Sequence, residues 1–101
     1  MKNLFDHLPC EKKEEFLTLL ESESVRIERI VSNGQSSPED FWYDQSEHEW
    51  VLLLKGAAHL KYGDGSTVAL RAGDHLHIPA RTRHRVESVS PDAIWLAVHY
   101  R

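Results

Sequence analysis

The chain has 101 residues, which is enough for one domain and leaves little for tails or linkers. Its formal net charge is −4, so no overall basicity draws it to nucleic acid or to an anionic membrane surface. A single cysteine excludes an intramolecular disulfide, and without an apolar run near the roughly 18 residues of a membrane span we expect a cytoplasmic protein.

The N-terminal region has the spacing of a short helix. Apolar side chains recur there at Phe16, Leu17, Leu19 and Leu20. Pro9 suits a first helical turn, and the glutamates that follow lie near the positive end of the helix dipole. The pattern predicts a helix over Cys10–Glu21, within an N-terminal helical segment of residues 1–24 that packs on a barrel of residues 25–101.

Beyond residue 21 the apolar pattern changes from a period of about 3.6 to a period of 2, which is typical of strands. Glycine, proline and aspartate separate the expected strands, as in the turn Gly63-Asp64-Gly65. The expected strands begin at Val25 and continue with Phe41–Leu54, Ala57–Tyr62, Ser66–Leu70, His75–Ile78, His84–Ser88 and Ala93–Tyr100. Short strands with a turn every ~8–12 residues predict an all-β sandwich or barrel.

A carboxylate lies on the inward face of the second expected strand. With strict alternation Tyr43, Gln45 and Glu49 share a face that continues as Val51 and Leu53 into the core. A carboxylate on a core face is costly unless it is paired, hydrogen-bonded or bound to a metal. The alternatives are that Glu49 is solvated at an open rim or that a bulge turns it outward.

The histidines of the next region fall on two faces. His84 alternates with Val86 and should point inward, where a neutral imidazole suits a metal. His75 and His77 alternate with inward Leu76 and are expected on a solvated outer face. The outward arginines nearby are expected to discourage strand addition at an edge, or to clamp a phosphate or carboxylate. They are Arg81, Arg83 and Arg85.

Taken together, these two stretches resemble the two sequence motifs of the cupin superfamily. The matching residues are Glu49, Gly56, Gly73, Pro79 and His84. Arg81 stands where the family usually has a glycine, and the resemblance covers about Ile30–Tyr100. It implies a small antiparallel jelly-roll barrel that holds any ligand in its interior, with one short N-terminal helix outside.

The resemblance implies a metal site with an altered set of ligands. The family's His-x-His pair falls on Tyr43 and Gln45, so both usual imidazole ligands are missing. Glu49 and His84 remain as metal ligands, and the amide oxygen of Gln45 is the expected third. Oxygen and nitrogen ligands suit Fe, Mn, Ni or Zn, and nothing in the sequence chooses among these divalent ions.

The last expected strand offers another imidazole. His99 shares a face with Trp95 and two alanines, which leave room for a cavity, so His99 could replace a missing ligand. It could equally lie at the barrel mouth or in a dimer contact. Trp42, Trp50 and Trp95 are the aromatic residues expected to line or close a ligand site, and Tyr43 is expected to orient a substrate or donate a proton.

Three functions stay open from the resemblance. The first is a metal-dependent enzyme that acts on a small molecule. The second is a non-catalytic sensor or accessory module that binds a small molecule or a metal. The third is a protein that acts only through its dimer surface. The small core, and a family that commonly pairs barrels through edge strands, predict a homodimer, with neither nucleic acid nor membrane as a partner.

Overall fold

The structure is a computed structural model that describes residues 2–9 and 14–101. Within these residues it contains eight β-strands and no α-helix. The strands are β1 (Glu15–Glu21), β2 (Val25–Val31), β3 (His48–Lys55), β4 (Ala57–Tyr62), β5 (Thr67–Arg71), β6 (His75–Ile78), β7 (His84–Val89) and β8 (Ile94–Tyr100). The part of the chain described here has no helix that is long and apolar enough to cross a membrane.

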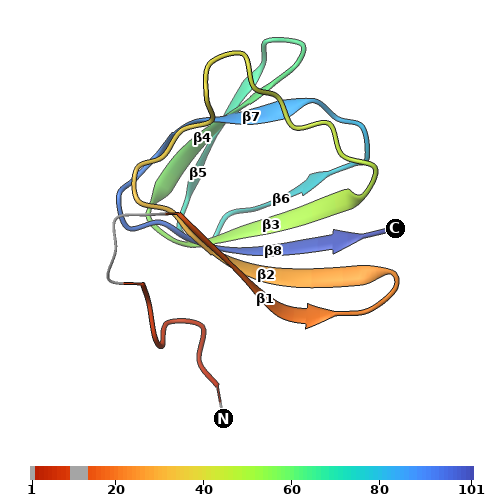
Figure 1. The fold of residues 1–101 in the computed structure, drawn as a ribbon. Coiled ribbons are helices and arrows are strands. Elements are labelled where there is room, and N and C mark those ends of the chain that lie inside the picture. Colours follow the sequence, from red (N-terminus) through yellow and green to blue (C-terminus); the bar gives the residue numbers. More distant parts are fainter. Residues whose placement is uncertain (1, 10–13) are drawn as a thin grey trace.

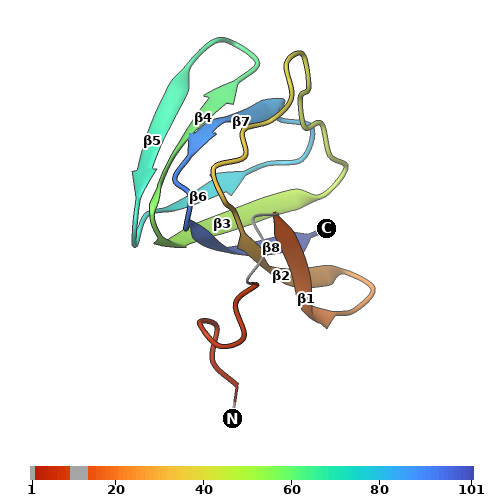
Figure 2. The same ribbon diagram turned by 60° about the vertical axis from the view of Figure 1, so that its left-hand side comes forward.

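The strands form two antiparallel sheets that lie over one another (Figure 1). The larger sheet has the order β1-β2-β8-β3-β6, and the smaller has the order β5-β4-β7. The view in Figure 2 shows the smaller sheet lying over the larger one. The connections β3–β4, β5–β6, β6–β7 and β7–β8 switch sheets, but no strand of one sheet pairs with a strand of the other. The expectation of a closed barrel is therefore wrong, and the fold is an open two-sheet jelly roll.

The expected N-terminal helix is also wrong. Residues 15–21 form the edge strand β1, which pairs antiparallel with β2, whereas residues 10–13 lie outside the described part of the chain. A bulge between Thr18 and Leu20 shifts the register, so Leu17 and Leu20 fall on the same face of the strand. The bulge thus reproduces the spacing of three that a helix would give.

The expected strand over 41–54 is shorter in the structure. It begins only at His48, and the residues before it form a loop that touches β7 through one isolated bridge between Tyr43 and His84. In this bridge the Tyr43 N–H donates to the His84 carbonyl at 2.7 Å, and the His84 N–H donates to the Tyr43 carbonyl at 3.2 Å. The loop therefore carries Tyr43 across the opening between the sheets.

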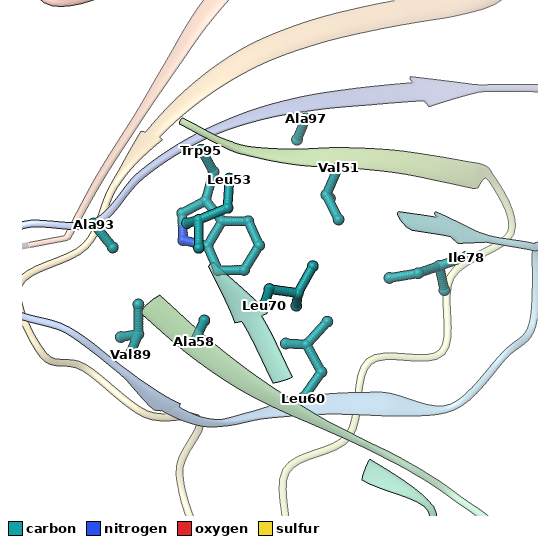
Figure 3. Packing of buried hydrophobic residues seen from close by; sticks show 10 residues of the cluster. All are labelled: Val51, Leu53, Ala58, Leu60, Leu70, Ile78, Val89, Ala93, Trp95 and Ala97. Carbon is teal, nitrogen blue, oxygen red and sulfur yellow. The ribbon is translucent and has the colours of Figure 1, made fainter. Parts of the chain in front are cut away.

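The core lies between the sheets, as alternation along the strands predicts. Figure 3 shows its side chains pointing inward from both layers. They are Val51, Leu53, Ala58, Leu60, Leu70, Ile78, Val89, Ala93, Trp95 and Ala97. Leu53 and Ile94 are completely enclosed, and burial of each such side chain stabilises the fold by roughly 1.5–3 kcal/mol.

The glycine between β3 and β4 gives a testable prediction for the fold. Gly56 has φ +94°, and a Cβ there would overlap the Ser90 hydroxyl and lie 3.0 Å from Ala93 Cα. Gly65 has a similar φ of +91° but faces open space. We expect Gly56→Ala to lower the free energy of unfolding by about 3 kcal/mol and Gly65→Ala by about 1 kcal/mol, since only the first adds a clash to backbone strain.

Denaturant unfolding of both variants measures this difference. Equal losses of stability would show that Gly56 is not held against Ser90 and Ala93.

Candidate functional site

A cavity of about 200 Å³ lies between the two sheets. Its lining is divided between apolar and polar side chains. The apolar ones are Phe16, Ile30, Val51, Leu60, Ile78, Val86 and Trp95. The polar ones are Arg26, Glu28, Tyr43, Gln45, Glu49, His84 and His99. The cavity thus contains the six sequence-predicted site residues Tyr43, Gln45, Glu49, His84, Trp95 and His99.

Glu49 lies between two imidazoles. Its strand, β3, is hydrogen-bonded to β8, where Glu49 is the register partner of His99, while His84 begins β7 in the other sheet. Glu49 Oε1 is 3.6 Å from His84 Nε2, and its Oε2 is 3.8 Å from His99 Nε2. The three residues are 8%, 6% and 5% exposed, so a buried carboxylate is placed beside two groups that can carry positive charge.

His84 is oriented by its own backbone. Its Nδ1 lies 2.8 Å from the Thr82 carbonyl, an acceptor, so Nδ1 carries a proton and Nε2 faces Glu49. Burial alone would lower the pKa of His84, but the interactions with Glu49 and with the Thr82 carbonyl outweigh it. The pKa of His84 is therefore raised from its ordinary 6.5, which favours the imidazolium paired with Glu49.

His99 has a second carboxylate partner. Its Nε2 lies 3.0 Å from Glu28 Oε1, and Arg26 lies 3.7 Å from the same carboxylate and 3.4 Å from Glu47. The other ring nitrogen of His99, Nδ1, is buried and has no hydrogen-bond partner in the described residues. Within the polar lining, a connected series of side chains therefore runs from Arg26 through Glu28 and His99 to Glu49.

Tyr43 covers one side of this series. Its ring stacks on the ring of His84, with centroids 5.2 Å apart and planes inclined by 21°. Burial, together with the charges of Glu14 and Glu49, raises the pKa of the phenol from 10.0, so Tyr43 stays protonated and can only act as a hydroxyl donor or neutral acceptor near neutral pH. Gln45 also lines the cavity, while its backbone carbonyl accepts a hydrogen bond from Arg81 N–H at 2.7 Å.

The three tryptophans lie in different places. Trp95 lines the cavity. Trp42 packs outside the cavity lining, with the guanidinium groups of Arg83 and Arg85 5.0 and 5.8 Å from its ring centroid. Trp50 alternates with Glu49 and Val51, so it lies on the other face of β3, beside the ring of His75. Of the predicted aromatic lining, the structure brings only Trp95 to the site among the described residues.

The outward histidines are where strand parity places them. His75 and His77 are exposed, and His77 Nε2 is 2.6 Å from the Tyr100 hydroxyl. The inward position of His84 and the outward position of this pair are therefore both confirmed.

Sequence reasoning missed Arg26 and Glu28. Both lie on β2, whose register with β8 pairs Arg26 with His99 and Ile30 with Trp95. The inward parity of His99 and Trp95 was available from the sequence, but the pairing of the second strand with the last was not. Without this long-range register, the sequence predicts that the charged residues of β2 lie on a solvent-exposed face.

The donor set does not fit a metal ion as it stands. Over residues 2–9 and 14–101, no three His, Cys, Asp or Glu side chains are arranged to hold one. Glu49 and His84 face each other, but His99 already bonds Glu28 through the nitrogen that is turned toward Glu49. A complete site would require His99 to leave Glu28, or Gln45 to supply the third ligand.

The fold of this chain matches known proteins. A family model described as Cupin domain matches residues 27–99. A protein from Ralstonia eutropha JMP134, provisionally named a mannose-6-phosphate isomerase, is 44% identical with a TM-score of 0.92, over 99% of this chain and 96% of that one. A cupin superfamily protein from Desulfitobacterium hafniense DCB-2 is 20% identical with a TM-score of 0.79, over 92% and 82%.

The iron(II) form of HppE in complex with substrate is 17% identical, with a TM-score of 0.71, and the match covers 84% of this chain and 52% of that one. At this identity the likeness to HppE concerns the fold alone. No curated protein is significantly similar in sequence to this chain.

The pairing of His84 with Glu49 predicts an unusual pH dependence of stability. Because the pKa of His84 is raised in the folded state, its contribution is complete below about pH 6.5 and is lost as pH rises through the folded-state pKa. In Glu49→Gln the partner charge is gone, and burial should then lower the pKa of His84. Relative to this variant, the wild type should lose stability between about pH 6 and 8.

Denaturant unfolding of the two proteins across this range measures the effect. Parallel curves would contradict an ion pair between His84 and Glu49.

Proposed function

The chain belongs to the cupin family, and we propose that it binds one small molecule in the cavity between its sheets and moves a proton on that molecule. The observation that carries this proposal is the position of Glu49, which is buried between His84 and His99 in the lining of a largely apolar cavity. Perturbed titratable groups that converge on a cavity are the usual mark of a reactive site.

Glu49 and His84 have complementary roles in this proposal. The carboxylate of Glu49, which faces the imidazoles of His84 and His99, can accept a proton from a bound molecule. His84 can donate one, because its Nδ1 is held by Thr82 and its Nε2 is turned inward. Tyr43, stacked on His84, supplies a hydroxyl that can orient the bound molecule. Two neighbouring titratable groups can act as an acid and base pair when their surroundings favour the protonated form of one and the deprotonated form of the other.

A metal-dependent reaction is the second candidate. The observation that favours it is the inward Nε2 of His84, fixed by Thr82 and opposed by Glu49, since metal-bound histidines commonly have their other nitrogen held in this way. A bound Fe, Mn, Ni or Zn ion would polarise an oxygen of the substrate as a Lewis acid. Since the described donors lack a third ligand in position, the ion stays a prediction.

The proposal can be tested by exchange of carbon-bound protons. Cyclohexanone is a small probe whose protons next to the carbonyl exchange with D₂O when a base removes them, and NMR measures the rate. We expect wild-type protein to accelerate exchange about 10²-fold or more over Glu49→Gln, because general base catalysis contributes about 10²–10⁴-fold. Glu87→Gln, an exposed glutamate on β7 that pairs with Arg85, is the matched control and should behave as wild type.

If cyclohexanone binds but its protons do not exchange faster, the proposed proton transfer is wrong and the protein is a binding module. If cyclohexanone does not bind, the proposed interior site is wrong. Elemental analysis of the same untagged preparation decides between the two candidates. A stoichiometric metal ion that is lost in His84→Ala and kept in His77→Ala would favour the metal-dependent reaction over proton transfer by side chains alone.

A further inference from the structure

The walls of the cavity are apolar on both sides. Val51 of β3 and Leu60 of β4 point into the space between the sheets from opposite layers (Figure 3). Ile78, Val86 and Trp95 continue this wall, and none of the five carries a hydrogen-bonding group on the aliphatic or ring surface it presents, apart from the indole N–H of Trp95. A hydroxyl placed against this wall would lose its bonds to water without replacement.

Five of the seven polar side chains that line the cavity form one connected cluster. His84, Glu49, His99 and Glu28 follow one another at separations of 3.6, 3.8 and 3.0 Å. Arg26 ends the series and is shared between Glu28 and Glu47. Tyr43, which stacks on His84, and Gln45 add two further hydrogen-bonding groups, and the rest of the lining is apolar.

The charges of this cluster are already balanced by each other. Glu49 and Glu28 oppose the approach of an anion, and Arg26 is occupied by two carboxylates. A cationic head would compete for Glu49 with the imidazoles of His84 and His99, which lie 3.6 and 3.8 Å from its two carboxylate oxygens. A neutral hydroxyl head can donate to Glu49 and accept from His84, and a neutral carbonyl head can accept from His84; neither adds a charge that must be desolvated.

The cavity volume limits the body of the ligand. About 200 Å³ is somewhat larger than the cavity of roughly 150 Å³ that holds benzene in an engineered protein. One six-membered ring with one small substituent therefore fits this volume, and a longer ligand would extend out of the cavity, which is partly open to solvent.

From this lining, charge and volume we infer that the ligand is a neutral molecule of one-ring size with an apolar body and a single hydroxyl or carbonyl head. This inference rests on the interior site proposed above and specifies its substrate class. The inferred ligand differs from the sugar phosphate in the name of the relative from Ralstonia eutropha. A hexose phosphate would present several hydroxyls and a dianion to a cavity that has an apolar wall and two carboxylates.

Four small molecules that differ in charge and polarity test the inferred ligand class. Phenol has the expected neutral head, benzoate and benzylamine place a charge on the same ring, and mannose 6-phosphate represents the sugar phosphates. The methyl NMR signals of Val51 and Leu60 report binding inside the cavity. We expect phenol to shift these signals with a dissociation constant at least about tenfold lower than that of any other probe.

Two variants separate size from charge. Val86→Leu narrows the cavity and should weaken phenol binding severalfold, whereas Val25→Leu makes the same change outside the lining and should not. Glu49→Gln removes one negative charge at nearly constant shape, so it should tighten benzoate binding about tenfold or more. The charge variant gives an answer even if Val86→Leu fails to fold.

The outcomes distinguish this inference from the proposal it rests on. If no probe shifts the methyl signals of Val51 and Leu60, the interior site itself is wrong. If benzoate, benzylamine or mannose 6-phosphate binds there more tightly than phenol, the site stands and the inferred class is wrong. Benzoate binding that is unchanged in Glu49→Gln would overturn the argument from charge.

Discussion

The buried carboxylate of Glu49 is the constraint on which the rest of the site depends. Removal of an ionised group from water costs several kcal/mol unless partners replace the lost hydration, so the fold must bring positive or hydrogen-bonding groups to it. It does so from three directions: His99 comes from the neighbouring strand β8, His84 comes from the opposite sheet, and Tyr43 packs on His84 from the loop before β3. The two sheets are thus tied together at a polar point beside the hydrophobic core.

Much of this arrangement could be predicted from the sequence, because strand alternation is a local property. The alternation of side chains along a strand predicts the inward positions of Glu49 and His84 and the outward positions of His75 and His77. What failed depended on nonlocal information. The bulge in β1 gives its apolar residues the spacing of a helix, so the strand is predicted as a helix. The pairing of β2 with β8, which turns Glu28 toward His99, cannot be predicted from either segment alone.

Membership of the cupin family does not decide the chemistry of the chain. The sequence resemblance places Tyr43 and Gln45 at the positions of the family's usual histidine pair, which stays a prediction, and the nitrogen of His99 that faces Glu49 is bonded to Glu28. We therefore base the proposed proton transfer on the observed contact of Glu49 with His84 in the lining of the cavity rather than on the family. The homodimer and the cytoplasmic location expected from the sequence stay predictions.

The ¹⁵N chemical shifts of the His84 ring nitrogens, recorded above the pKa of the imidazole, would decide whether the ring is oriented as an acid and base pair with Glu49 requires. We predict the neutral form with the proton on Nδ1, donated to the Thr82 carbonyl, and an unprotonated Nε2 turned toward Glu49 and the cavity. On acidification the second proton should appear on Nε2. A neutral ring that carries its proton on Nε2 would contradict the orientation of His84, and with it the proposed acid and base pair.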